Sequence, residues 1–140
     1  MKKVTLLLFA ATTLLTVSCN KDDEKDIDHS LDGTKWATKI EDWYYFKSCD
    51  VIEFFDGQTT SYDADENYHI TSSASTMGTG KYRKDGSKVT FQDFVENHNS
   101  STGNYTITFL SGEITGTIMK VQYEYKGDTT RINTRTYTKI

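Results

Sequence analysis

The chain contains no proline and only two cysteines among its 140 residues. Without proline, its turns must be made by glycine, aspartate, asparagine and serine, which tolerate the backbone conformations that tight turns need. Leucine is also scarce, because only Leu31 and Leu110 follow the first eighteen residues, whereas eighteen threonines do. Leucine favours helices and threonine favours strands, so this balance argues against a helical protein.

Basic residues are not clustered in this chain, whose net charge is −4 at pH 7. A nucleic-acid-binding surface needs grouped lysine and arginine, so we expect no nucleic-acid partner. The three histidines are isolated, and no nucleophile motif or metal-ligand spacing occurs. We therefore expect neither an enzyme nor a bound cofactor or metal. The acidic run over residues 63–67 is expected to form a solvated loop.

The longest apolar stretch, residues 4–17, is broken only by threonines and follows two lysines. It is too short for a finished membrane-spanning helix and has the layout of a secretory signal. We predict a signal peptide over residues 1–18, a stalk over 19–30 that begins with a lipidated cysteine, and one folded domain over 31–140. Removal of the signal leaves fourteen basic against twenty acidic residues, which makes the net charge −6.

Cys19 follows the small Ser18 and resembles the cysteine of the bacterial lipobox, which is lipidated and becomes the new N-terminus. Thr16 stands where most lipoboxes have leucine, as in the relaxed lipoboxes of Bacteroidetes lipoproteins. In that group an acidic run directs export to the surface, and Lys21, Asp22, Asp23 and Glu24 form a similar run. The resemblance implies a lipid anchor in the outer membrane, facing the cell exterior. Two alternatives stay open. In the first, the signal ends at a signal peptidase I site and Cys19 is incidental, and in the second, the acidic run is only a solvated tether.

Segments of alternating apolar and polar residues fill the remaining chain and are separated by turn pairs. These pairs are Asp56-Gly57, Asp85-Gly86, Ser111-Gly112 and Gly127-Asp128. Alternation of this kind predicts antiparallel strands joined by hairpins, and a slip of phase between Ile118 and Met119 predicts a bulge. About eight strands result. They favour an all-β fold, a small up-and-down antiparallel β-barrel, with a meander β-sandwich as the alternative.

The same alternation predicts which side chains face the interior. We expect a rather full barrel with five large residues inward: Trp36, Phe54, Phe91, Phe109 and Ile118. In the last strand we expect Ile132 to face inward and Arg131 and Arg135 to face outward. Cys49 precedes an apolar segment, so we expect its thiol to be buried rather than reactive.

Residues 31–36, Leu-Asp-Gly-Thr-Lys-Trp, resemble the start of the lipocalin-like domains of Bacteroidetes lipoproteins. The strand pattern extends this resemblance to residue 140. That family usually has Gly-x-Trp, whereas the spacing is Gly33-x-x-Trp36 in this chain. The resemblance implies that Gly33 and Trp36 form a plug, with the indole at the closed end of the barrel. It also implies that a late arginine, Arg131 or Arg135, packs on the indole.

Four consecutive aromatic residues lie between the first two predicted strands: Trp43, Tyr44, Tyr45 and Phe46. The lipocalin-like resemblance implies that this connection lies at the open end of the barrel, where we expect the four rings to form a lid over a ligand or an anchor patch for a partner protein. Ordinary core packing is the alternative. Two functions therefore stay open. The barrel binds a small apolar or amphipathic ligand, or it is a protein-interaction or inhibitor domain of a cell-surface complex, with a filled barrel.

Overall fold

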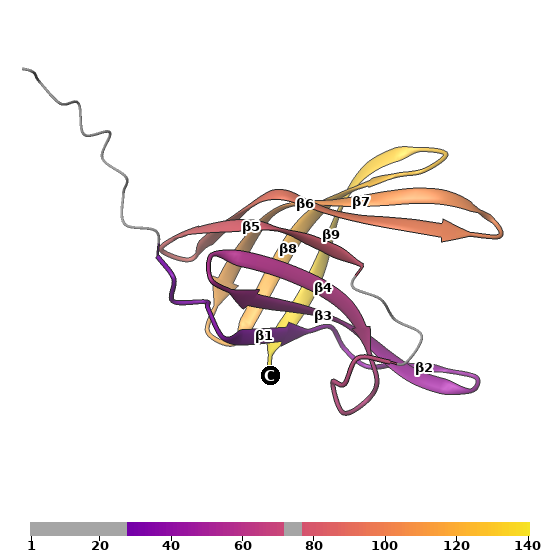
Figure 1. Ribbon diagram of the computed structural model, residues 1–140, viewed down its shortest axis with the longest axis horizontal. Helices are drawn as coiled ribbons and strands as arrows, with labels where there is room; N and C mark the ends of the chain where they lie inside the picture. Colours follow the sequence, from indigo (N-terminus) through magenta and orange to yellow (C-terminus); the bar gives the residue numbers. More distant parts are fainter. Residues whose placement is uncertain (1–27, 72–76) are drawn as a thin grey trace, which may run out of the picture.

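Figure 1 shows the computed structural model, which describes residues 28–71 and 77–140. All the regular structure in these residues is β, as the composition predicts. Nine strands follow one another: β1 (Thr34–Ala37), β2 (Glu41–Trp43), β3 (Phe46–Phe55), β4 (Gln58–Ala64), β5 (Gly78–Asp85), β6 (Lys88–Ser100), β7 (Gly103–Thr115), β8 (Ile118–Lys126) and β9 (Thr130–Lys139). The predicted signal peptide and most of the predicted stalk lie outside the described residues.

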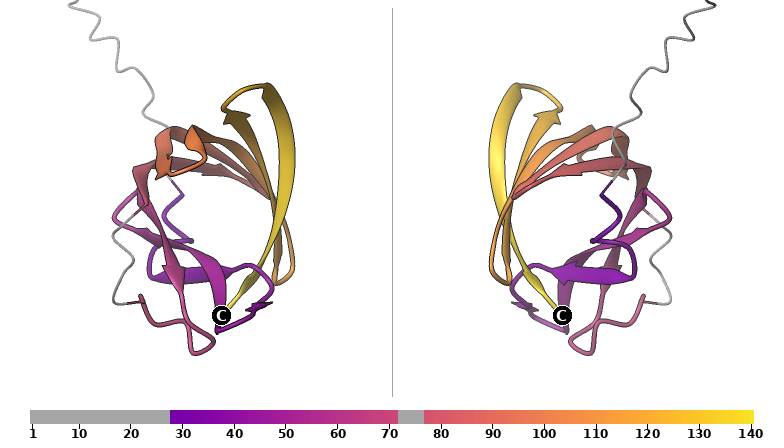
Figure 2. Two further views of the ribbon diagram at one scale, coloured as in Figure 1. Left: turned by 90° about the vertical axis from the view of Figure 1, so that its right-hand side faces the viewer. Right: turned by 90° about the vertical axis from the view of Figure 1, so that its left-hand side faces the viewer.

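The strands form a closed barrel. From β3 to β9, each strand pairs antiparallel with the next one in the sequence. β1 closes the wall because it pairs with β3 on one side and with β9 on the other. Figure 2 shows the resulting ring. The up-and-down barrel of eight strands is therefore confirmed, and β2 is an extra strand in a projecting hairpin with β3 (Figure 1).

Three of the four predicted turns are present, between β3 and β4, between β5 and β6, and between β8 and β9. The turn predicted at Ser111-Gly112 is wrong, because both residues lie within β7. The chain turns instead at Gly116, whose φ of +59° is the left-handed conformation that favours glycine. The phase slip between Ile118 and Met119 therefore marks the start of β8 and not a bulge.

The bulges lie elsewhere, where register shifts interrupt the pairing of β5 with β6, of β6 with β7 and of β7 with β8. At the β6 bulge, Asp93 has a φ of +54° and Phe94 turns into the interior. β5 makes room for this ring with Gly80, where a Cβ would lie 2.5 Å from the Cβ of Phe94. Bulges bend strands and increase their twist, which a small closed barrel requires.

Apolar side chains fill one end of the barrel, the end with the β3–β4 and β5–β6 turns, called here the filled end. Four of the five residues predicted to face inward are buried: Trp36, Phe54, Phe91 and Phe109. Phe94 stacks on Phe109 with the ring centroids 4.2 Å apart. The prediction for Ile118 is wrong. This residue is exposed at the start of β8, and the next residue, Met119, is buried in its place.

The segment before β1 is attached to the filled end. The carboxylate of Asp32 accepts a 3.0 Å hydrogen bond from the Gly57 N–H and a 2.6 Å hydrogen bond from the Tyr82 hydroxyl. Asp28 forms an ion pair with Lys84, with a nitrogen–oxygen distance of 2.7 Å. The chain therefore enters the barrel at the end that side chains fill.

A second apolar cluster lies on the outer face of β3 and β4. Cys49 is buried there, as predicted, together with Ala37, Val51, Tyr62 and Ala64. Burial raises the pKa of the Cys49 thiol to about 11, and nearby carboxylates add to this effect. The thiol is therefore protonated at neutral pH and is a poor nucleophile.

Candidate functional site

The residues of β9 that face the interior differ from the prediction. β9 pairs with β8 without a register shift, so the residues opposite buried positions of β8 also face inward. These residues include Arg135 and Tyr137, whereas Ile132 is 56% exposed. The prediction that Ile132 faces inward and that Arg131 and Arg135 face outward is therefore wrong, because the ladder with β8 sets the phase of the strand.

Arg135 belongs to a charged cluster that also contains Asp50 of β3 and Asp63 of β4. The Arg135 Nη1 and Asp50 Oδ2 atoms are 2.5 Å apart, and these two side chains are 25% and 30% exposed. Asp50 is paired directly with Asp63 in the register, and their carboxyl groups interact. The guanidinium carbon of Arg135 also lies 5.0 Å from the centroid of the Tyr123 ring. Two carboxyl groups and one cation from three strands therefore meet inside the barrel.

The surroundings of the charged cluster shift its pKa values. Burial raises the pKa of Asp63 to about 6, and the neighbouring Asp50 and Glu96 carboxyl groups add to this rise. Burial opposes the charge on Arg135, but Tyr137 and Asp50 outweigh it and raise the pKa of Arg135 further above its usual range. Asp63 therefore takes up a proton in mildly acidic solution while Arg135 stays charged.

Buried polar atoms line the interior behind the charged cluster. Four of them lack a hydrogen bond of standard geometry among the described residues: Thr59 Oγ1, Ser61 Oγ, Glu96 Oε1 and the Tyr137 hydroxyl, which lies beside Arg135. Glu96 is only 1% exposed, and its other oxygen lies 3.1 Å from Nε2 of His98. Gly78 makes space for this carboxylate, because a Cβ there would lie 2.9 Å from the Glu96 Cγ. Buried polar atoms without a partner are rare in folded proteins, and a bound water or a polar group of a ligand can satisfy them.

Stacked rings continue from Glu96 along the inner face of the sheet. His98 stacks on Tyr105 with the ring centroids 4.5 Å apart, and Tyr105 lies 5.1 Å from Tyr125. Arg131 lies over the Tyr125 ring at 5.2 Å. Both late arginines therefore have cation–π contacts with tyrosines of β8.

A pocket of about 960 Å³ opens beside the Asp50–Arg135 ion pair. Its lining includes Thr38, Lys39, Phe46, Ser48, Asp63 and Thr134. The pocket lies where β9 is no longer paired with β1, because that pairing ends at Ala37 and the chain then continues beside β3 into β2. The charged cluster therefore forms part of the wall of an accessible pocket, at the opposite end from the entering chain.

The four consecutive aromatic residues lie at the tip of the β2–β3 hairpin (Figure 1). Tyr44 and Tyr45 are 96% and 91% exposed, and their ring centroids are 5.6 Å apart. Phe46 is also exposed and lines the pocket. The side chain of Trp43 is not among those that the structure describes. The structure therefore places this segment beside the pocket, with the three described rings in contact with solvent.

The two residues predicted to form a plug lie at the filled end. Gly33 has a φ of +77° and donates its N–H to the Phe54 carbonyl oxygen at 2.7 Å. Trp36 is buried in the main core cluster, and its Nε1 donates a 3.0 Å hydrogen bond to the Thr34 hydroxyl. The indole nitrogen is therefore satisfied locally, and the ring contributes to apolar packing.

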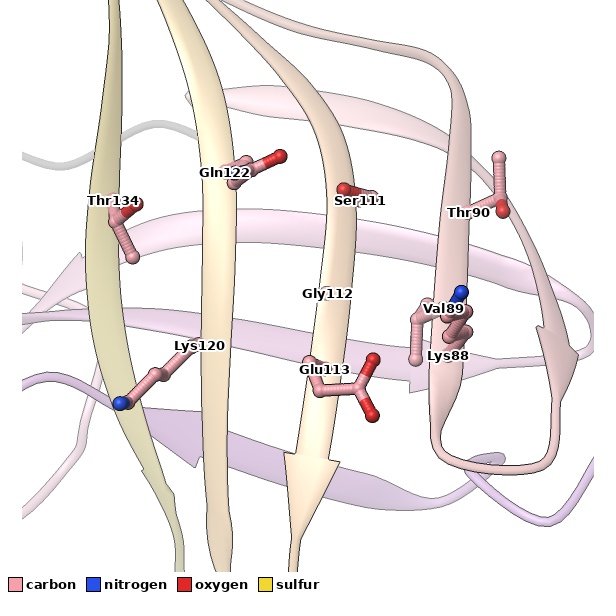
Figure 3. Close-up of a pocket in the computed structure, with 9 residues that line it drawn as sticks. All are labelled: Lys88, Val89, Thr90, Ser111, Gly112, Glu113, Lys120, Gln122 and Thr134. Atoms are coloured by element: carbon pink, nitrogen blue, oxygen red, sulfur yellow. The ribbon is translucent and has the colours of Figure 1, made fainter.

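A second pocket of about 510 Å³ lies on the outer face of β6 to β9 (Figure 3). One row of its lining crosses the four strands in register: Thr90, Ser111, Gln122 and Thr134. In the neighbouring row, Glu113 is paired with Lys88 on one side and Lys120 on the other. The side chains of both rows are exposed or partly exposed, and none is a buried unpaired group, so this pocket is the weaker candidate.

The predicted lipidation site Cys19 and the predicted export signal at residues 21–24 lie outside the described residues. Within residues 28–71 and 77–140, no group of three or more histidine, cysteine or acidic side chains is placed to hold a metal ion. The same residues contain no helix that is long and apolar enough to cross a membrane.

Comparisons with protein-family models, with curated proteins and with solved structures found no match for this chain. The barrel is nevertheless the architecture that the lipocalin-like resemblance implies. The function of this protein is therefore inferred from the charged cluster and the pocket beside it.

Sequence reasoning missed the charged cluster. The prediction of a solvated loop over residues 63–67 is wrong for Asp63, which belongs to β4, and the outward direction predicted for Arg135 is wrong because this residue pairs with the buried Val121. Asp50 lies two residues before Ile52 and so shares its inward phase, which was a signal available in the sequence. Arg135 likewise lies two residues before the buried Tyr137.

Proposed function

We propose that this protein is a lipid-anchored, lipocalin-like binding protein of the bacterial outer membrane, and that its barrel binds a small amphipathic ligand. The lipobox-like sequence at Cys19 supports the anchor, and the acidic run at residues 21–24 supports display on the cell surface. The contacts of Asp28 and Asp32 with the filled end support an orientation in which this end faces the membrane. The pocket then faces away from it.

The observation that carries this proposal is the pocket of about 960 Å³ beside the charged cluster. A purely apolar ligand needs an apolar cavity, but aromatic side chains occupy the filled end. The lining of the pocket instead offers carboxyl groups, a guanidinium and hydroxyls, together with the apolar ring of Phe46. A ligand with a polar head and a small apolar part matches this arrangement, because few well-placed polar groups orient a ligand in a largely preformed pocket.

Native mass spectrometry of the full protein, purified in detergent from its own host, tests the proposal. We expect a bound small molecule that is released on unfolding. The double variant Asp50→Asn with Arg135→Gln removes both charges of the ion pair at nearly constant volume, so it should lose the ligand. Thr90→Ala, in the outer pocket, should retain it. Retention of the same molecule by the double variant would place the ligand elsewhere.

The second candidate, a protein-interaction or inhibitor domain, is favoured by the exposed rings of Tyr44 and Tyr45. Exposed aromatic groups at a hairpin tip are typical anchors in protein interfaces. A photo-crosslinking residue at position 44 on intact cells should then capture one discrete protein. The same residue at Thr90 is the control, and equal labelling from both positions would count against this candidate.

A further inference from the structure

Most of β9 lacks a second neighbouring strand among the described residues. β1 pairs with β9 only through Trp36–Lys139 and Ala37–Thr138. β9 nevertheless begins at Thr130 and pairs with β8 along its whole length. The edge from Thr130 to Thr136 therefore has a partner strand on one side only.

The main-chain groups on this edge point away from β8 at every second residue. Ile140 donates its N–H to the Lys35 carbonyl of β1, which shows that even-numbered residues of β9 direct their main-chain groups toward β1. No register shift interrupts the ladder between β8 and β9. The N–H and C=O groups of Ile132, Thr134 and Thr136 therefore point in the same direction, beyond the end of β1.

The space that these groups face is called here the slot, and it borders Thr130–Thr136 of β9 on the side away from β8. It begins where β1, which pairs with both β9 and β3, ends at Ala37. Beyond Ala37 the chain leaves β9 and stays beside β3, where Thr38 donates its N–H to the Asp50 carbonyl at 2.9 Å and β2 pairs with Phe46–Ser48. The pocket of about 960 Å³ borders the slot, because Thr134 and Thr136 are among its lining residues.

We propose that the slot binds an extended peptide segment of another protein, which adds to β9 as a strand and carries an acidic side chain opposite Arg131. Neighbouring strands lie about 4.7–4.9 Å apart, so an extended chain at this distance from β9 takes the place beside β9 that β1 holds near the filled end. Strand addition of this kind takes its affinity from main-chain hydrogen bonds and its specificity from alternate side chains. This inference goes beyond the small ligand proposed above.

The side chains beside the edge define the chemistry of the peptide. Arg135 is already paired with Asp50, whereas Arg131 is exposed and lies over the Tyr125 ring. A carboxylate on the added strand is therefore matched to Arg131. On the outer face, the exposed Ile132 has threonines two residues away on either side, and β-branched residues on the added strand suit this surface.

Two other occupants are less favourable. A second copy that pairs through its own β9 brings further arginines to the edge, and its residues Thr130–Thr136 include no acidic side chain that could pair with Arg131. The N-terminal segment of the same chain is held at the filled end by Asp28 and Lys84. A segment of another protein avoids both difficulties.

Amide hydrogen exchange of the full protein at two concentrations tests whether the slot is open. We expect rapid exchange at Ile132, Thr134 and Thr136, and protection at Asn133 and Arg135, whose amides face β8. Protection of the even-numbered amides would overturn the proposal. Protection that increases with concentration would identify a second copy, and protection independent of concentration would identify the chain's own residues.

Calorimetry with a synthetic probe tests the partner. The probe is a seven-residue peptide with blocked ends, in which a central glutamate is flanked by alternating threonine and valine. Thr134→Pro removes one N–H that faces the slot, and proline is tolerated at a strand edge, so the barrel should remain folded. We expect at least tenfold weaker binding of the probe to this variant, and binding within twofold of wild type for Thr134→Ala.

Charge reversal tests the assigned register. A probe with lysine in place of glutamate should bind wild type at least tenfold more weakly and should bind Arg131→Glu better than the glutamate probe does. Equal binding of both probes to wild type, unchanged binding to Thr134→Pro, or no binding of the glutamate probe at millimolar concentration would each overturn the proposal. These variants leave Asp50 and Arg135 intact, so failure here does not affect the test of the small ligand.

Discussion

Replacement of Asp63 by asparagine is expected to stabilise the fold at neutral pH. The folded protein raises the pKa of Asp63 from 3.8 to about 6, through burial and through the neighbouring Asp50. Above pH 6 the folded chain therefore holds a second carboxylate beside the first. Asparagine carries no charge, and its amide can donate a hydrogen bond to Asp50 at every pH.

The size of this effect follows from the shift in proton affinity. At about 1.36 kcal/mol per tenfold change in affinity, the shift corresponds to about 3 kcal/mol. The charged cluster is partly open to solvent and contains Arg135, so we halve this value to about 1–2 kcal/mol. Between pH 4 and 6 the folded state binds more protons at Asp63 than the unfolded state does. The contribution of Asp63 to the unfolding free energy is therefore most favourable below pH 4, decreases as the pH rises to 6, and is constant above pH 6.

Urea denaturation followed by tryptophan fluorescence measures the effect at pH 7.5 and at pH 4. Asp63→Asn should exceed wild type in unfolding free energy at pH 7.5 and should nearly equal it at pH 4. Asp56→Asn, in the exposed β3–β4 turn, removes the same charge and should change stability by less than about 0.5 kcal/mol at either pH. If Asp63→Asn is less stable than wild type at pH 7.5, then Arg135 stabilises the charged form more than burial and Asp50 destabilise it, and the reasoning is refuted.

Three further predictions concern the core and the anchor. Trp36→Ala should lower the unfolding free energy by about 3–5 kcal/mol, because it removes a fully buried indole, and a loss below about 1 kcal/mol would contradict this role. Gly80→Ala should cost about 1–3 kcal/mol in the same denaturation assay, since its methyl group meets Phe94. Thr79→Ala, on the outer face, is its control. Cys19→Ala should abolish labelling by a palmitate analogue and release the protein from membranes, whereas alanine at residues 21–24 should keep the lipid but protect the protein from protease added to whole cells.

The architecture could be predicted from the sequence because alternation and turn residues report directly on strands and hairpins. The failure at Ser111-Gly112 shows the limit of this approach. The register shift between Phe109 and Ser111 lets one long strand change phase without turning, so the pattern within β7 reads as two strands. A glycine can mark a turn or a close contact, and Gly112 belongs to the second kind, since a Cβ there would lie 3.3 Å from the Met119 sulfur.

The charged cluster could not be predicted because hydrophobic alternation assumes an apolar interior. Asp50 and Arg135 are separated by 85 positions in the sequence and meet only because the barrel closes. The inward direction of these two side chains could be inferred from Ile52 and Tyr137. Their ion pair could not, because it forms just beyond the end of β1, between strands that are distant in the sequence. The position of the pocket is therefore a property of the closed ring, and no single strand encodes it.

The contacts of Asp32 determine how the barrel responds to tension on its N-terminal side. A pull on the chain before residue 28 first meets the ion pair with Lys84 and then Asp32, which holds Gly57 and Tyr82. β1 comes afterwards, and this strand of four residues is the seam that joins the two edges of the ring. A pulling force is therefore shared with the segments that contain Gly57 and Tyr82 before it reaches β1. The hydrogen bonds of Asp32 have to break before a pull from the N-terminal side reaches β1.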